Sequence, residues 1–566
     1  MSLIGALRLG QSALAATQAA IQTTGNNITN AGDPNYTREV ANVTPSPSQQ
    51  IAPGVFLGSG VDLTSVQRQI DESLQNRLRG ATSDDEAAST TESWLSQIES
   101  TFNELSDQDL STQMSTFFNS WSDLANKPQD LGLRQVVVQN GQDLAQSVQS
   151  VRGQLGDLQA NAFQQAQSLT TNANSLAQQI ADINGQIVQA QGGTAGEDNG
   201  LLDQRDALLQ QLSQLVNIKT VPQSDGSTNV YVGSDPLIIG TENRGVGVKQ
   251  QTVNGTLESE IIFKANNGTM EVTSGQLAAL NGVAESITGV INQIDTLSHN
   301  LIFELNKVYS SGQGLNGLSN ATATNAATNP AVALNDPTSG FKYTPTSGSF
   351  VVHVTDKNTG LSTSTLVQVD LDGQNGNDTT LNSLASSIDA ISNISASVSG
   401  GKLSISADSA NVDFSFSQDS SGTLAALGIN SFFSGTDGGN IAVNSNVAAD
   451  PSMLAAAKNG DAGDNQTAIA IAAMQNAPIA ALNGSSLNDT YQAMINSVSN
   501  SAASAKTNAD AADTVKQTLT SQREALSGVS LDEEAVNLIQ QQRAYQGAAR
   551  FVSTIDQMMQ TLLAIT

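Results

Sequence analysis

The sequence has no cysteine and little positive charge. Its 566 residues include 23 Lys and Arg against 52 Asp and Glu, a formal net charge of −29. The missing cysteines exclude disulfides, thiol nucleophiles and cysteine-ligated metals. The negative balance argues against nucleic acid, because binding it depends on neutralising phosphates with Lys and Arg. The same repulsion disfavours anionic membrane surfaces.

Long apolar runs are also missing. No stretch approaches the roughly 20 apolar residues that cross a bilayer, so we expect no membrane insertion. Polar residues interrupt the first twenty positions every few residues, and we expect no cleaved secretory signal there. With 566 residues, the chain should divide into several domains.

Signals for catalysis are scarce. The two histidines, His299 and His353, lie in a helix-like and a strand-like segment, and structural or surface roles are expected for both. Patterns of the HExxH, GxSxG and Walker A types do not occur. Residues 312–317 formally match GxGxxG, but they follow a helical segment in a glycine-rich stretch, which is the wrong context for dinucleotide binding. We therefore expect no enzyme activity and no cofactor.

One acidic loop, residues 370–378, resembles a calcium-binding loop. Asn375 stands where such loops need glycine, and Leu381 where they need a bidentate glutamate. A turn rich in Asx residues is the favoured interpretation, and no metal site is predicted.

The two ends of the chain carry apolar residues at alternating spacings of four and three. This spacing puts one face of a helix against a partner. Ordinary domain core would give the same pattern, but the N-terminal face includes Gly10, Thr17 and Thr24 and buries little alone. We therefore predict that the terminal helices pair as a coiled coil or meet other subunits, through Leu3, Leu7, Leu14, Ile21 and Ile28 at one end and Phe551, Ile555, Met558, Leu562 and Ile565 at the other.

Between the ends, the pattern predicts a mainly α fold with a β insert. The first helix should end near Gly25, and helical spacing resumes from Leu63 to Leu78. A long helix is expected over 144–187 and a linker over 311–340. The expected domains are 1–62, N-terminal helix and turn; 63–330, a helical rod domain with a small β subdomain near 217–272; 341–440, a β-rich insert; 441–527, return helices of the rod domain; and 528–566, the C-terminal helix.

The N-terminal block SALAATQAAIQTTGNNITNAGDPNYTREV resembles the start of bacterial flagellar rod, hook and hook-associated proteins. Asn27, Asn30, Tyr36 and Arg38 carry the pattern. The chain departs from it at Asp33-Pro34-Asn35, where the family more often has Thr-Pro-Gly. Asn35 is expected to supply the positive φ of that glycine.

The C-terminal block GVSLDEEAVNLIQQQRAYQGAARFVSTIDQMMQTLLAIT, which includes Leu538 and Tyr545, resembles the end of hook-associated proteins at the hook–filament junction. Two internal blocks point to the same members, LLDQRDALLQQLSQLVNIKTVPQSDGSTNVYVG and SGQLAALNGVAESITGVINQIDTLSHNLIFELNKVYSSGQGLNG. The insert at 341–440 is the least diagnostic part.

The resemblance implies a structural protein without catalytic activity. Its terminal helices would form an inner coiled-coil layer, and the β-rich insert would point outward. Implied partners are further copies of the chain, the hook protein and the next hook-associated protein on the filament side. Export through the flagellar type III channel would follow a transient cytoplasmic pool, with a chaperone on residues 531–565. Two alternatives stay open: another axial protein of the hook or distal rod, and a secreted enzyme or adhesin with coiled-coil ends.

Overall fold

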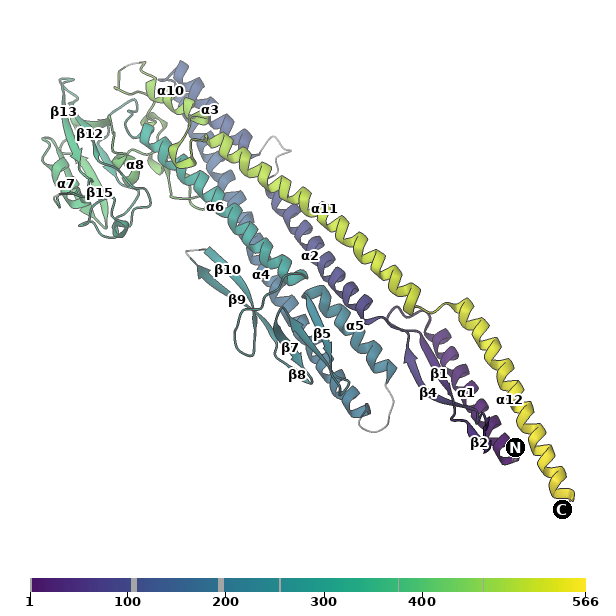
Figure 1. Ribbon diagram of the computed structural model, residues 1–566. Helices are drawn as coiled ribbons and strands as arrows, with labels where there is room; N and C mark the ends of the chain where they lie inside the picture. Colours follow the sequence, from purple (N-terminus) through teal and green to yellow (C-terminus); the bar gives the residue numbers. More distant parts are fainter. Residues whose placement is uncertain are drawn as a thin grey trace. The chain divides into compact units, whose positions relative to one another are not determined.

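The computed structural model describes residues 3–102, 109–191, 198–253, 256–374, 376–461 and 463–565. The chain is mainly α-helical with several small antiparallel sheets, in agreement with the predicted class (Figure 1). The chain divides into two compact units. The first comprises Met1–Trp94, Ala162–Ala284 and Ser504–Thr566, and the second Leu95–Asn161 and Glu285–Ala503.

The longest elements are helices. Their bounds are α1 Leu3–Asn30, α2 Glu72–Phe102, α3 Leu110–Asn126, α4 Leu131–Gln191, α5 Asn199–Leu215, α6 Gln276–Tyr309, α7 Leu381–Asp389, α8 Thr423–Leu427, α9 Ser445–Ala449, α10 Gln466–Ala473, α11 Leu487–Ser527 and α12 Leu531–Ile565. Within the described residues, no helix is both long enough and apolar enough to cross a membrane.

The strands are short and pair antiparallel. The first unit holds β1 Glu39–Pro45 with β4 Val61–Arg68, β2 Gln49–Ala52 with β3 Val55–Leu57, the sheet β5 Ile218–Pro222, β6 Thr228–Val232, β7 Asp235–Ile239 and β8 Glu242–Asn243, and β9 Val246–Val253 with β10 Thr256–Phe263. The second unit holds β11 Asn320–Thr322, β12 Gly348–Asp356, β13 Ser362–Val369, β14 Ile394–Ser399, β15 Lys402–Ala407, β16 Val412–Ser417, β17 Phe433–Ser434 and β18 Ala442–Val443.

In the first unit, the C-terminal part of α4 packs against α5 through Ile183, Ile187 and Leu202. A buried asparagine on the same helix turn, Asn184, donates to the carbonyls of Thr228 and Gly240 at 2.9 and 2.7 Å. These bonds tie α4 to the β5–β8 sheet and satisfy the buried amide, which would otherwise be costly.

An aromatic cluster forms the core of the second unit. The ring of Phe117 on α3 lies 5.2–6.4 Å, between centroids, from Phe118, Trp121, Phe432 and Phe433. Edge-on and tilted contacts at these distances are favourable beyond the apolar area that they bury. Phe117 and Phe432, which are far apart in the sequence, thus belong to one core.

The β-rich region has a core of its own, which runs from Ala321 to Ile429 and includes β12, β13, β15, β16 and α7. The sheets order as β13-β12-β16 and β11-β15-β14. At its exit, the Asn430 side chain donates to the carbonyls of Ser310 and Gly312 at 3.1 and 3.0 Å. The chain therefore enters and leaves this region at nearly the same place.

Several expectations about elements are wrong. Leu63 and Val66 lie in strand β4, whose pairing with β1 overrides their helix-like spacing of three. The first helix continues past Gly25 to Asn30. The expected linker 311–340 contains β11 and buried residues of the β-rich core, such as Leu334.

The long helix is confirmed and is longer than expected, since α4 has 61 residues against a predicted span of 144–187. Strands are also confirmed within the two stretches expected to be β-rich, near 217–272 and at 341–440.

Candidate assembly interface

The first and last helices of the described chain lie side by side in the first unit (Figure 1). A small residue permits their close approach: a Cβ atom at Gly10 of α1 would lie 2.5 Å from Val552 Cγ2 and 3.2 Å from Phe551 Cδ1 on α12. Further along, the Thr24 hydroxyl donates to Gln541 Oε1 at 3.0 Å. The terminal helices α1 and α12 therefore contact each other. Their pairing as a coiled coil stays a prediction.

Small residues, rather than leucines, form the buried face of α1. The buried residues are Gly10, Ala16, Thr23, Thr24 and Asn27. The predicted apolar residues of this helix are each only half-buried: Leu3, Leu7, Leu14, Ile21 and Ile28.

Most of the predicted face of α12 is open. Ile555 is 4% exposed, whereas Met558 is 55% and Leu562 57% exposed. Leu538 is half-buried, Tyr545 and Phe551 are exposed, and the side chain of Ile565 lies outside the described residues. The predicted interface residues do not include four further exposed apolar side chains on this helix, Leu531, Val536, Ile539 and Leu563.

A polar cluster joins the end of α1 to the start of α12, and Asn27 is its centre. Asn27 is 1% exposed and donates to the carbonyl of Glu39 at 2.9 Å and to Glu534 Oε2 at 3.1 Å. Its Oδ1 accepts from the Tyr36 hydroxyl and from the Glu39 amide, both at 2.9 Å. Both donors and both lone pairs of the amide are used. We call Asn27, Tyr36, Arg38 and Glu534 the Asn27–Glu534 cluster.

The ionic part of the cluster is Arg38 with two successive glutamates. Arg38 Nη2 and Nε lie 2.7 and 2.9 Å from Glu534 Oε1, and Nη1 lies 3.1 Å from Glu533 Oε2. The side chain of Glu534 is 2% exposed and that of Glu533 63%. The Arg38 amide also donates to the carbonyl of Ser527 at 2.9 Å. A buried, charge-assisted contact therefore links residues about 500 positions apart in sequence, as the separation of 507 between Asn27 and Glu534 shows.

Tyr36 and Asn30 each make a hydrogen bond to the last residues of α1. Burial, and then the neighbouring Glu39 carboxylate, raise the pKa of the Tyr36 phenol, which stays protonated to donate its hydrogen bond. Asn30 Nδ2 donates to the carbonyl and Oδ1 of Asn26, at 3.1 and 3.0 Å, and so closes the last turn of α1.

The expectation for Asn35 is wrong, because it is not among the residues with positive φ. Asp33 makes the turn instead: its Oδ1 accepts from the Asn35 amide at 2.9 Å, and its carbonyl accepts from the Tyr36 amide at 3.2 Å. This is an Asx turn, which needs no left-handed residue. A polar cavity of about 450 Å³ lies beside it, lined mainly by residues 30–38, 523–525 and 527–530.

Sequence reasoning missed Glu534, Glu39 and Gln541 as contact residues. The acidic first turn of α12 was visible in the sequence as Asp532, Glu533 and Glu534. Acidic residues are common at helix N-termini, where they favour the helix dipole. The pattern alone does not separate the buried Glu534 from the exposed Glu533.

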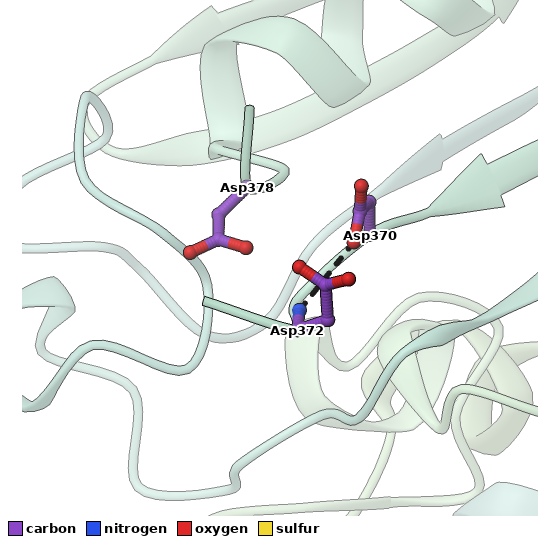
Figure 2. Close-up of side chains that lie close together, drawn as sticks. All are labelled: Asp370, Asp372 and Asp378. Atoms are coloured by element: carbon purple, nitrogen blue, oxygen red, sulfur yellow. Dashed lines mark hydrogen bonds between the residues drawn. The ribbon is translucent and has the colours of Figure 1, made fainter. Parts of the chain in front are cut away.

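The acidic loop of the β-rich region brings three carboxylates together (Figure 2). Oxygen atoms of Asp370, Asp372 and Asp378 lie within 4.8 Å of one another. Each carboxylate accepts a hydrogen bond from an amide group of the same loop, at 2.8 to 3.0 Å. Asn375, at the sixth loop position, lies outside the described residues. The bonds are those of an Asx-rich turn, and we assign no ion to it.

Both histidines make structural contacts. His299 stacks on Tyr343, with 4.4 Å between ring centroids, and its Nδ1 lies 3.0 Å from the Thr436 carbonyl. The two ring nitrogens of His353 lie 2.8 and 2.7 Å from the hydroxyls of Ser364 and Ser417. Burial lowers the pKa of His353.

Comparison with known proteins gives two family matches. Residues 95–323 match the flagellar hook-associated protein FlgK helical domain, and residues 521–565 match the C-terminal segment of flagellar basal body rod FlgEFG proteins. A solved flagellar hook junction protein FlgK from Burkholderia pseudomallei covers 80% of this chain and 100% of its own, with a TM-score of 0.50. Its sequence identity is 17%, so this likeness concerns the fold.

Curated relatives extend the comparison. Flagellar hook-associated protein 1 of Bacillus subtilis is 32% identical over 161 residues, which are 27% of this chain and 32% of the relative. The Salmonella typhimurium protein of the same name is 30% identical over 146 residues, 26% of each chain. The chain thus spans a third or less of the length of these relatives. These matches confirm the predicted resemblance: residues 95–323 are similar to the helical domain of flagellar hook-associated proteins, and residues 521–565 to the C-terminal segment of flagellar rod proteins.

Proposed function

We propose that this chain is a structural subunit of the bacterial flagellum that joins the hook to the filament. It would assemble through its terminal helices. The observation that carries the proposal is the open apolar face of α12, where Met558, Leu562 and Leu563 are 55%, 57% and 74% exposed. Apolar surface gathered along one element is typical of interaction sites.

The arrangement of α12 suits a helix with more than one partner. Ile555 is buried in the single chain, and Val552 lies against α1 at Gly10. Ile555, Met558 and Leu562 follow at spacings of three and four and so share one face of α12. Of these three, Ile555 is buried in the single chain, while Met558 and Leu562 stay open. In the assembly, helices of neighbouring copies would cover this face and form a coiled-coil layer, with the predicted interface residues of both ends as its contacts.

The proposed partners follow the family matches. They are copies of this chain, the hook protein on one side and the next hook-associated protein on the filament side. A cytoplasmic export chaperone would cover residues 531–565 before assembly, since the same apolar face needs protection there. The mature location would be the extracellular flagellum.

The domain division is part of the proposal. The terminal segments 1–62 and 528–566 would form the inner layer, 63–330 and 441–527 the rod domain, and 341–440 an outward insert. The separate core between Ala321 and Ile429 supports an insert that folds by itself.

A hook or distal rod protein is the nearest alternative, and the match of residues 521–565 to rod proteins fits it. The match of 95–323 to a hook-associated helical domain favours the junction instead. We propose a structural rather than an enzymatic role, because the histidines and the acidic loop are engaged in structural contacts.

The test is a deletion of the gene in its own bacterium, with the intact gene restored on a plasmid as control. Electron microscopy should show hooks without filaments in the deletion strain, and flagellin should accumulate in the medium. Restored filaments in the complemented strain would support the junction role. Normal filaments after deletion would refute it, and loss of the hook itself would favour the rod or hook alternative.

A further inference from the structure

A second cavity in the first unit, of about 290 Å³, is lined by three arginines. They come from three elements: Arg68 ends β4, Arg79 lies on α2 and Arg205 on α5. The chain has only 23 basic residues and a net charge of −29. Gathering three guanidinium groups at one cavity is therefore unusual for this sequence.

All three side chains are buried. Arg79 and Arg205 are 3% and 9% exposed, and the side chain of Arg68 is 7% exposed. Buried arginines normally have a carboxylate partner, because an uncompensated charge is costly away from water.

Arg68 makes the shortest ion pairs with the carboxylates at this cavity. Its Nη1 lies 2.8 Å from Asp203 and 2.7 Å from Asp206. Arg79 reaches the other carboxylate oxygen of Asp206, Oδ1, only at 3.6 Å and otherwise donates to neutral oxygens. Glu72, the other acidic residue of the lining, is exposed.

Among the described residues, all hydrogen-bond partners of Arg205 are neutral. Its Nη1 donates to Asn184 Oδ1 at 3.3 Å and to the Gly226 carbonyl at 2.7 Å. Its Nε is buried, and no acceptor for it lies within the described part of the chain. Burial lowers the pKa of both Arg205 and Arg79, so their surroundings disfavour the charge that arginine retains.

We propose that this cavity binds a small oxyanion, a carboxylate or a phosphate-type group, through the guanidinium groups of Arg205 and Arg79. An oxyanion supplies the acceptor that Arg205 Nε lacks, and it adds negative charge beside Arg205, whose own hydrogen-bond partners are neutral. Guanidinium groups bind such planar or tetrahedral oxygen pairs through parallel N–H bonds. An ordered water would accept one hydrogen bond but would add no negative charge beside Arg205. The ligand could be a free anion or an acidic side chain of another copy, which share this chemistry.

The test uses the purified full-length chain and two probes, inorganic phosphate and acetate, each titrated at constant ionic strength with chloride as the balancing anion. Calorimetry should detect saturable binding at one site. Arg205→Lys keeps the charge but removes Nε, and should weaken binding about tenfold or more, the loss of one charged hydrogen bond. Arg77→Gln is the matched control, since Arg77 is an exposed residue of the same helix as Arg79, and should leave binding unchanged.

A second measurement does not depend on how the variant folds. In wild-type protein labelled with ¹⁵N-arginine, the Arg205 Nε–Hε resonance, identified by its absence in Arg205→Lys, should move as the probe is added. Binding of acetate as well as phosphate would point to a carboxylate source, and binding of phosphate alone to a free tetrahedral anion. The proposal is overturned if neither probe moves this resonance beyond the effect of chloride. It is equally overturned if Arg205→Lys binds phosphate as the wild type does.

Discussion

Replacing Glu534 with alanine should destabilise the Asn27–Glu534 cluster, which joins the end of α1 to the start of α12. The side chain is 2% exposed and faces Arg38 Nη2 at 2.7 Å and Asn27 Nδ2 at 3.1 Å. Breaking a fully buried ion pair costs about 3–5 kcal/mol. Because the Arg38 side chain is 19% exposed and can be partly hydrated, we expect a smaller loss here, about 2–4 kcal/mol.

The neighbouring glutamate is the matched control. Glu533 contacts the same Arg38 at 3.1 Å, but its side chain is 63% exposed. An exposed ion pair contributes about 0–1 kcal/mol, so Glu533→Ala should have little effect. The two variants remove the same side chain from the same helix turn and differ mainly in burial.

Hydrogen exchange is the suitable assay, because a chain with several units has no single unfolding free energy. The reporter is the Arg38 amide, which donates to the Ser527 carbonyl. A loss of about 2–4 kcal/mol should speed its exchange about 30- to 1,000-fold. If Glu533→Ala and Glu534→Ala speed exchange equally, or if neither does, the Asn27–Glu534 cluster does not stabilise the contact between α1 and α12.

Three further predictions follow from packing and charge. Gly10→Ala should destabilise the α1–α12 contact by about 1–3 kcal/mol through overpacking, measured by exchange of the α12 amides. Gly25→Ala in the same helix, with no atom within 4 Å of its added Cβ, should be neutral or slightly stabilising, and equal effects would contradict the close approach. Replacing residues 317–429 with a short linker should leave the aromatic core folded, whereas replacing 336–444 should unfold it. Near-UV circular dichroism measures this, and equal spectra for the two deletions would contradict a β-rich core that is separate from the aromatic core. Burial lowers the pKa of His353 from 6.5, so the neutral side chain contributes its full stability above pH 6.5 and loses it as the pH falls towards the lowered pKa. The midpoint of the His353 titration, followed by NMR, should therefore lie below 6.5, and a higher midpoint would refute this.

The helices of the chain could be predicted because their signal is local. Apolar spacing located both terminal helices and the long α4. The same rule failed at Leu63 and Val66, because two apolar residues are too short a pattern to establish a helix and because pairing with β1 decides the structure. Strand pairing depends on residues distant in sequence, which a periodicity within one segment does not record.

The contacts of the termini were harder to predict than their helices. Spacing identifies an apolar face but not which of its residues a single chain covers, and Ile555 is buried while Leu562 is open. Gly10 was visible as a small residue, yet its contact with Val552 depends on a helix more than 500 positions away. The burial of Glu534 likewise follows from the tertiary position of Arg38.

Assembly through the open face of α12 is the central claim, and one pair of variants tests it most directly. Leu562 and Leu361 are both exposed, at 57% and 74%, so aspartate at either position should leave the single chain folded. Leu562 lies on the face that we expect neighbouring copies to cover, and Leu361 lies in the β-rich region. The measurement is electron microscopy of cells that carry Leu562→Asp or Leu361→Asp in place of the native gene, with secreted protein assayed in the same cultures. We predict that Leu562→Asp protein reaches the medium while hooks stay without filaments, and that Leu361→Asp cells have normal filaments. Normal filaments on Leu562→Asp cells would contradict assembly through this face.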